Sequence, residues 1–224
     1  SRERIQQYSE EIIDWLIKQD CKMVIVACNT ASSLAIDYLK KKFSLPIIGV
    51  IDPVVQLAIS RTKSQSIGVI GTRATIQSNA YGEKLKSIRP KINILNQSCP
   101  LFVPLVEEGL TKGTITKLIV ESYLSHFKNT DVDTLILGCT HYPILKAVIK
   151  DVVGKDISLV DSGKATAEVV MENLNKNGLL SEESNGRVYS FVTDSKQSFQ
   201  KVITKALTPE INISIKSINR IDIG

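Results

Sequence analysis

The chain has 224 residues, a formal net charge of +5 and 43% hydrophobic residues, a globular composition that excludes disordered, collagen-like and disulfide-stapled classes. No apolar run approaches the roughly 20 residues of a membrane-spanning helix, and the length suits one large domain or two small ones. The basic residues are scattered apart from a run at 40–42, and only 5% of the residues are aromatic, which argues against nucleic-acid binding.

Strand and helix patterns alternate along almost the whole chain. Continuous apolar runs predict strands, in chain order, at residues 23–27, 46–51, 66–70, 91–95, 134–137, 157–160, 187–192 and 211–218. Apolar residues at helical spacing predict helices at 5–19, 30–42, from 52 onward, 74–86, 103–108, 115–127, 142–152, 164–177 and 195–207. Apolar strands such as 23–27 are typical of a parallel sheet that helices cover on both faces, so the sequence predicts an α/β fold.

The four cysteines are Cys21, Cys28, Cys99 and Cys139, and they include no C-x-x-C pair and no zinc-ligand spacing. A chain of this length can bury a core without a disulfide framework, and the sequence shows no secretory signal, so we expect reduced thiols in the cytosol. A free cysteine is usually a small buried hydrophobic residue. We keep that interpretation for Cys21 and Cys99.

The other two cysteines lie in segments that resemble each other. Residues 23–32 (MVIVACNTAS) and 134–143 (TLILGCTHYP) each consist of an apolar strand, a cysteine, one or two small polar residues and the start of a helix. Each helix leads to another apolar strand that ends in an aspartate, Asp52 or Asp161. This pattern indicates an internal duplication in which the two cysteines are counterparts.

The position of each cysteine favours anion chemistry. Parallel α/β sheets bind ligands beyond the carboxyl ends of their strands. The free N–H groups and the dipole at a helix start can lower the pKa of a thiol or hold a substrate carboxylate. Three side chains, Asn29, Thr30 and Thr140, add hydrogen-bond donors at these two helix starts.

Two equivalent cysteines suggest proton transfer rather than a single nucleophile. If the two halves face each other, Cys28 and Cys139 can remove and return a proton on opposite faces of one carbon, which is racemisation by two bases. The alternative is one nucleophilic cysteine assisted by His141.

The two cysteine segments also resemble a known family. Residues 26–32 (VACNTAS) and 137–143 (LGCTHYP) look like the two signatures of the glutamate racemases, in the cofactor-independent aspartate/glutamate racemase superfamily. Residues 68–75 (GVIGTRAT), 99–107 (CPLFVPLVE) and 191–194 (FVTD) are similar as well. The resemblance covers essentially the whole chain.

The resemblance implies a function and an architecture. It implies an enzyme that interconverts L- and D-glutamate with neither pyridoxal phosphate nor a metal, and that supplies D-glutamate for peptidoglycan in the bacterial cytoplasm. It implies two similar parallel-sheet α/β domains related by a pseudo-twofold axis, with the active site in the cleft between them, usually in a homodimer. We expect the first domain to comprise residues 1–50 plus 165–224 and the second to comprise residues 51–164.

The resemblance also implies roles for individual residues. The two proton donors and acceptors would be Cys28 and Cys139, with His141 assisting the second and Glu107 as the acidic residue beside this pair. The substrate contacts would be Asn29, Thr30, Thr72, Thr75, Thr140 and His141. On residue chemistry alone, Thr72 and Thr75 could be helix caps and Glu107 a surface carboxylate.

The resemblance departs from the family pattern at the amino end. Family members begin with an apolar strand ending in Asp-Ser-Gly-x-Gly-Gly, followed by a Pro-Tyr-Gly segment, and this sequence contains neither before its first predicted helix. We therefore expect the first domain to lack that strand and loop. The Asp-Ser-Gly at 161–163 follows a different strand and is better interpreted as a helix cap. Two alternative functions are an aspartate racemase-like enzyme and a non-catalytic form, either an inactive truncated chain or a protein that binds an acidic ligand.

Overall fold

In this computed structural model, the described residues are 1–182, 188–200 and 215–222. The strands are β1 (Val24–Val26), β2 (Ile47–Gly49), β3 (Ser66–Gly71), β4 (Asn93–Ser98), β5 (Thr134–Gly138), β6 (Ser158–Asp161), β7 (Val188–Val192) and β8 (Ile215–Arg220). The α-helices are α1 (Arg2–Ile17), α2 (Asn29–Leu34), α3 (Ile36–Lys42), α4 (Ile51–Arg61), α5 (Arg73–Gln77), α6 (Ala80–Ile88), α7 (Phe102–Glu107), α8 (Thr114–Leu124), α9 (Lys146–Val153) and α10 (Ser162–Lys176). Two 3₁₀ helices are η1 (Ser125–Asn129) and η2 (Tyr142–Leu145).

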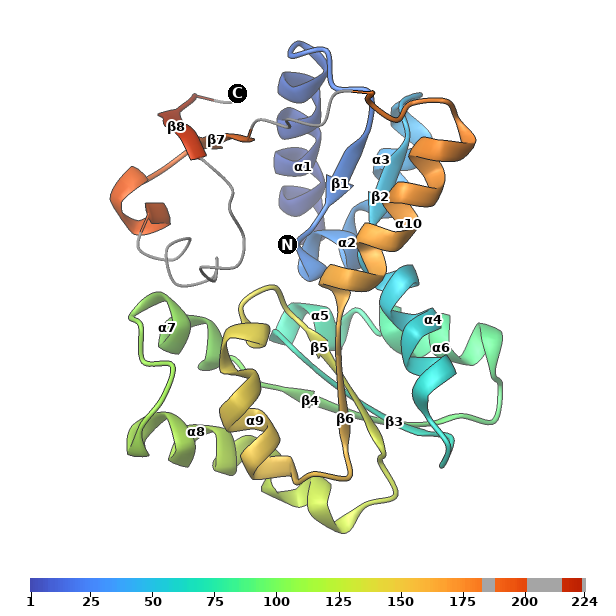
Figure 1. The fold of residues 1–224 in the computed structure, drawn as a ribbon, viewed down its shortest axis with the longest axis vertical. Helices are drawn as coiled ribbons and strands as arrows, with labels where there is room; N and C mark the ends of the chain where they lie inside the picture. The colour runs from blue at the N-terminus through green and yellow to red at the C-terminus, as the bar shows by residue number, and fades with distance from the viewer. Residues whose placement is uncertain (183–187, 201–214, 223–224) are drawn as a thin grey trace.

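The predicted α/β architecture with parallel sheets is confirmed. The largest sheet has four strands in the order β4-β3-β5-β6, and β1-β2 and β7-β8 form two smaller sheets. Every strand pair is parallel. In Figure 1, the β1-β2 sheet with α1, α3 and α10 lies in the upper half, and the four-stranded sheet lies below it. The domain boundaries at residues 50 and 164 stay a prediction.

The two central strands of the four-stranded sheet are buried on both faces, as their apolar residues predict, whereas the edge strand β4 is partly exposed. Every residue of β3 and β5 is buried. One face packs against α4 and α6, and the other against α7, α8 and α9 (Figure 1). Alternation in β5 illustrates this, because Leu135 and Leu137 enter one cluster and Ile136 enters the other. Burial of each such side chain contributes roughly 1.5–3 kcal/mol to the stability of the fold. The sheet therefore holds the residues that follow its strands in fixed positions.

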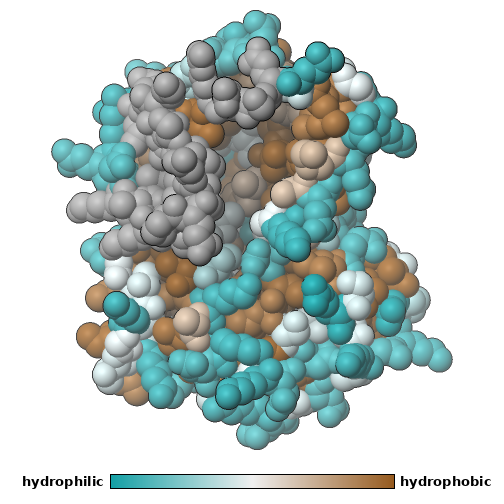
Figure 2. All heavy atoms as spheres, viewed as in Figure 1, coloured by the Kyte–Doolittle hydropathy of each residue, from teal (hydrophilic) through white to brown (hydrophobic). Residues whose placement is uncertain are grey.

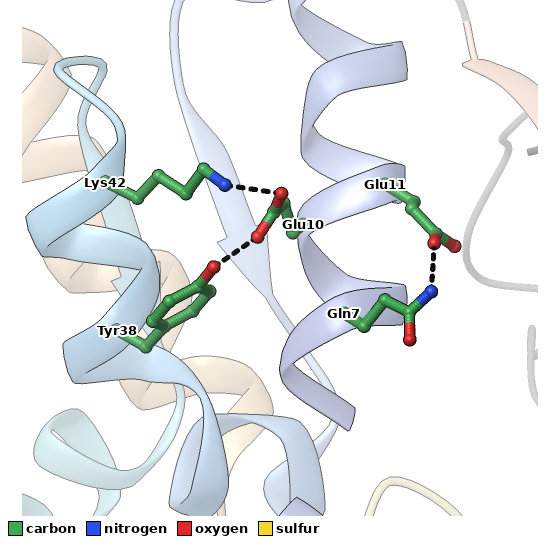
Figure 3. Close-up of polar contacts among 5 residues, drawn as sticks. All are labelled: Gln7, Glu10, Glu11, Tyr38 and Lys42. Atoms are coloured by element: carbon green, nitrogen blue, oxygen red, sulfur yellow. Dashed lines mark hydrogen bonds and ion pairs between the residues drawn. The ribbon is translucent and has the colours of Figure 1, made fainter. Parts of the chain in front are cut away.

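The smaller β1-β2 sheet is anchored by helix α1. Glu10 accepts a hydrogen bond from the Tyr38 hydroxyl and forms an ion pair with Lys42, which ties α1 to α3 (Figure 3). These contacts lower the pKa of the Glu10 carboxyl, with the Lys42 hydrogen bond as the main cause. Gln7 also donates to Glu11 along α1 at 2.8 Å. The lysine run at 40–42 thus supplies one residue, Lys42, to the packing of α1.

The predicted burial of strand 23–27 on both faces is wrong. Val24 is 5% exposed, but Ile25 is 45% exposed. The Ile25 side lines a cavity of about 450 Å³ together with Ala27, Val50, Thr140 and residues of α10, so the helix covers this face only loosely. Hydrophobic side chains line a hollow in the upper half of the face shown in Figure 2.

Two predicted helices are interrupted. The segment 30–42 is divided into α2 and α3 at Ala35, and 74–86 is divided into α5 and α6 at Asn79, whose φ is 56°. Asparagine tolerates this left-handed conformation better than most residues, so the chain can turn there at small cost. The turn separates α5 from α6, and α6 packs with α4 on one face of the sheet.

The ends of several elements also differ from the predictions. The 3₁₀ helix η1 follows α8 where one helix was expected to continue to 127, and η2 precedes α9 where a helix was expected from 142. Residues 196–200 are helical, and the rest of the predicted helix 195–207 lies outside the described residues, as do residues 211–214 of the last predicted strand. Among the described helices, none has the length and apolar character to span a membrane.

Candidate active site

Cys139 lies at the carboxyl edge of the four-stranded sheet. It directly follows Gly138 of β5, which pairs with Gly71 of β3. Thr72 follows Gly71, so the residues after these two strands lie side by side, as parallel strands dictate. Cys139 is 8% exposed and packs into the core cluster under η2.

Three of the predicted catalytic residues form a chain of polar contacts. The Cys139 Sγ atom is 3.9 Å from Nδ1 of His141, and Nε2 of His141 is 3.5 Å from Oε1 of Glu107. Glu107 is the last residue of α7, more than 30 positions away in sequence, and is brought here by the packing of α7 against η2. A carboxylate on one ring nitrogen sets which nitrogen carries the proton, so Glu107 can orient His141 toward the thiol.

Burial dominates the ionisation of Cys139. It raises the pKa of the thiol to about 11, although the backbone N–H groups of His141 and Tyr142 lower it, and a charge on Cys28 raises it further. The N–H groups at the helix start thus act in the expected direction, but burial outweighs them and the net shift of the pKa is upward. The helix after Cys139 begins as the short 3₁₀ turn η2, and two N–H groups do not offset removal from water.

The raised pKa of Cys139 predicts slow reaction with alkylating agents near neutral pH. Only the thiolate reacts, so the iodoacetamide rate at Cys139 is expected to rise about tenfold per pH unit from about pH 7 to about pH 9.5 without levelling off. Peptide mass spectrometry measures this rate separately from those of the other thiols. A plateau below about pH 9 would contradict the burial argument.

Cys28 has a different environment. It follows β1 and is the N-cap residue of α2, with its carbonyl accepting from the Ser32 N–H at 2.8 Å. Its thiol is exposed, whereas that of Cys139 is buried. The helix that Cys28 begins reaches the sheet edge of Cys139, because Thr30 is 3.0 Å from Thr72 and Thr72 follows Gly71, the partner of Gly138.

Three predicted threonines meet in one cluster. The hydroxyl oxygens of Thr30 and Thr72 are 3.0 Å apart, and each is 3.1 Å from that of Thr75. Thr72 is also the N-cap of α5, accepting from the Thr75 N–H at 3.2 Å. Thr72 is therefore a helix cap, and the three hydroxyl groups converge between the start of α2, beside Cys28, and the start of α5.

Thr140 lies elsewhere. It is exposed and lines the cavity of about 450 Å³ beside α10, not the threonine cluster. Asp161 is the N-cap of α10 and accepts from the Gly163 N–H at 3.1 Å, with Lys146 as an ion-pair partner at 3.2 Å. The interpretation of residues 161–163 as a helix cap is confirmed.

One residue of the site was missed by sequence reasoning. The Tyr81 hydroxyl donates to Oδ1 of Asn29 at 2.5 Å, and both residues are 2% exposed. The Asn29 Nδ2 atom is buried without a hydrogen-bond partner among the described residues. In the sequence, Tyr81 is an aromatic residue on the apolar face of a helix and has no signal that distinguishes it from an ordinary core residue.

Comparison with known proteins agrees with this geometry. Residues 1–170 match the family described as Asp/Glu/hydantoin racemase. A glutamate racemase from Geobacter metallireducens is 44% identical over 203 residues, which cover 90% of this chain and 75% of that protein.

Solved structures give the same result. A glutamate racemase isoform from Bacillus anthracis has a TM-score of 0.92 and 34% identity, covering 99% of this chain and 82% of the other. A glutamate racemase from Francisella tularensis, solved in complex with D-glutamate, has a TM-score of 0.88 and 33% identity, covering 100% of this chain and 81% of the other. The chain therefore belongs to the Asp/Glu/hydantoin racemase family and, within it, to the glutamate racemases, which makes it an isomerase of the amino-acid racemase class.

Proposed function

We propose that the protein interconverts L- and D-glutamate by two-base proton transfer at Cα, with Cys28 and Cys139 on opposite faces of the substrate. The observation that carries the proposal is that both cysteines follow strands at one shared edge: Thr30, two residues after Cys28, is 3.0 Å from Thr72, and Thr72 follows the residue that pairs with Gly138, next to Cys139. The chemistry needs two such groups, because a single base returns the proton to the face it came from.

The proposed reaction balances with the two thiols alone. The thiolate of one cysteine takes the Cα proton, and the resulting carbanion is delocalised into the substrate carboxylate. The thiol of the other cysteine then gives its proton to the opposite face. Each turnover exchanges the protonation states of the two cysteines, and exchange with solvent restores them. The proposed steps use neither pyridoxal phosphate nor a metal.

His141 and Glu107 support Cys139 in this proposal. With a pKa of about 11, the Cys139 thiol holds its proton at neutral pH and is ready to act as the acid. To act as the base, it must first lose that proton, and Nδ1 of His141 at 3.9 Å is placed to accept it. Glu107 stabilises the imidazolium that forms, through its contact with Nε2.

We propose that polar residues near the two cysteine segments hold the substrate. We assign the threonine cluster of Thr30, Thr72 and Thr75 and the unpartnered Nδ2 of Asn29 to substrate carboxylates. We assign Thr140 and His141 to substrate contacts on the Cys139 side. From the family we further propose a homodimer in the bacterial cytoplasm that supplies D-glutamate for peptidoglycan.

Solvent proton exchange tests the proposed reaction. In D₂O without added cofactor, L-glutamate is expected to give D-glutamate that carries deuterium at Cα, while early unreacted substrate keeps its proton, because the incoming proton comes from the second thiol. NMR and chiral chromatography measure both pools. Exchange with aspartate alone would favour the aspartate racemase alternative, and no exchange with either would favour a non-catalytic binding protein. A covalent substrate adduct by intact mass would favour the nucleophilic alternative.

A further inference from the structure

The side chain of Tyr81 lies between the two cysteine segments. It belongs to α6, which packs on the four-stranded sheet, and its hydroxyl reaches Asn29, the residue after Cys28. Its ring also lies beside Gly138, the residue before Cys139. A Cβ placed on Gly138 would be 3.1 Å from Cε2 of Tyr81. One buried phenol thus contacts the neighbours of both proposed bases.

The hydrogen bond from Tyr81 fixes the orientation of the Asn29 amide. Burial raises the pKa of Tyr81 far above its usual range, so the phenol keeps its proton and can donate it. Oδ1 of Asn29 accepts the hydrogen bond from the phenol, so Nδ2 is not used by Tyr81 and neither of its N–H groups has a partner among the described residues. A buried donor without a partner is rare in folded proteins, so these two N–H groups are available to bind a ligand.

We propose that Tyr81 is a positioning residue that fixes the Asn29 amide with its N–H groups directed at a carboxylate of the substrate. This inference rests on the proposed function of the same site. The hydrogen bond spans the two halves of the molecule, since Asn29 begins α2 and Tyr81 lies on α6. Tyr81 therefore adds one contact between the Cys28 helix and the sheet that carries Cys139, beside the hydrogen bonds of Thr30 to Thr72 and Thr75.

The Tyr81→Phe variant removes only the hydroxyl and keeps the ring beside Gly138. Oδ1 of Asn29 then no longer accepts a hydrogen bond from residue 81, and the amide can rotate. The KM for glutamate is therefore expected to rise about tenfold, which corresponds to the free energy of one typical hydrogen bond. The kcat is expected to change less than about threefold, because the thiols keep their places. Tyr123→Phe is the matched control, since this partly buried ring packs on Phe102 outside the site.

A double-mutant cycle separates positioning from a general structural effect. In an Asn29→Ala background, Tyr81→Phe is expected to have no further effect on KM, because the group that it orients is absent. An equal rise in KM in both backgrounds, or an unchanged KM in the single variant, would overturn the proposal. Asn29→Asp provides a second, independent test. This variant keeps an acceptor for the Tyr81 hydroxyl but has no N–H donors, so its KM should rise as in Asn29→Ala.

Failure of the two-base proposal can be distinguished from failure of the Tyr81 inference. If the unaltered protein binds D-glutamate by calorimetry but does not racemise it, the two-base proposal fails, and the Tyr81 inference is tested on Kd with the same variants. Tyr81→Phe should then weaken Kd about tenfold in the native background and not in Asn29→Ala. An unchanged Kd in the native background contradicts the inference whatever the enzyme does.

Discussion

Replacing either Cys28 or Cys139 by serine is expected to lower the racemisation rate in both directions by a factor of about 10² to 10⁴, the usual contribution of one general acid or base. Both directions fail together because each direction uses one cysteine to remove the proton and the other to return it. A serine hydroxyl preserves the size of the side chain but is far too weak an acid and base to replace the thiol.

The control for both variants is Cys21→Ser. Cys21 follows α1, is partly exposed, and belongs neither to the threonine cluster nor to the contacts of Cys139 with His141 and Glu107. Its loss should therefore leave the rate unchanged. Circular dichroism follows racemisation from each enantiomer, and deuterium uptake at Cα reports residual proton abstraction. If a serine variant kept more than about a tenth of the rate in one direction, the assignment of two essential bases would be refuted.

Gly138→Ala is expected to lower the free energy of unfolding by about 2–3 kcal/mol and to reduce activity by displacing Cys139. The new Cβ would lie 2.7 Å from the backbone oxygen of Ile70 and 3.1 Å from Cε2 of Tyr81. The oxygen belongs to β3, which is hydrogen-bonded to β4 and β5 and cannot move aside. Forcing an added methyl group into a packed interior typically costs 1–3 kcal/mol.

Thermal unfolding measures this change, and about 2–3 kcal/mol corresponds to a fall in Tm of roughly 5–10 °C for a chain of this length. Gly163→Ala is the matched control, because its added Cβ meets only the Asp161 side chain, at 3.3 Å, within helix α10. That variant should keep or slightly raise the stability, since alanine is the better helix residue. Equal Tm values for the two variants would contradict the close-contact argument.

Local patterns in the sequence were sufficient for the fold class and for the cysteine pair. Buried strands such as 66–71 and 134–138 are apolar along their length, and this property survives in any packing that covers both faces of a sheet. The cap formed by Asp161 was predictable for the same reason, because its partner Gly163 is two residues away. The breaks at Ala35 and Asn79 were not, since both segments continue with helical spacing.

The sequence by itself therefore determined the alternation of strands and helices, the duplicated cysteine segments and the family to which they point. Only the tertiary structure decided that burial raises the pKa of Cys139 to about 11, that Glu107 approaches Nε2 of His141 to 3.5 Å, where the resemblance had implied only a nearby acidic residue, and that Tyr81 holds Asn29. The physical reason is common to all three. Desolvation and side-chain contacts depend on which distant segments pack together, whereas strand and helix patterns depend on neighbours along the chain.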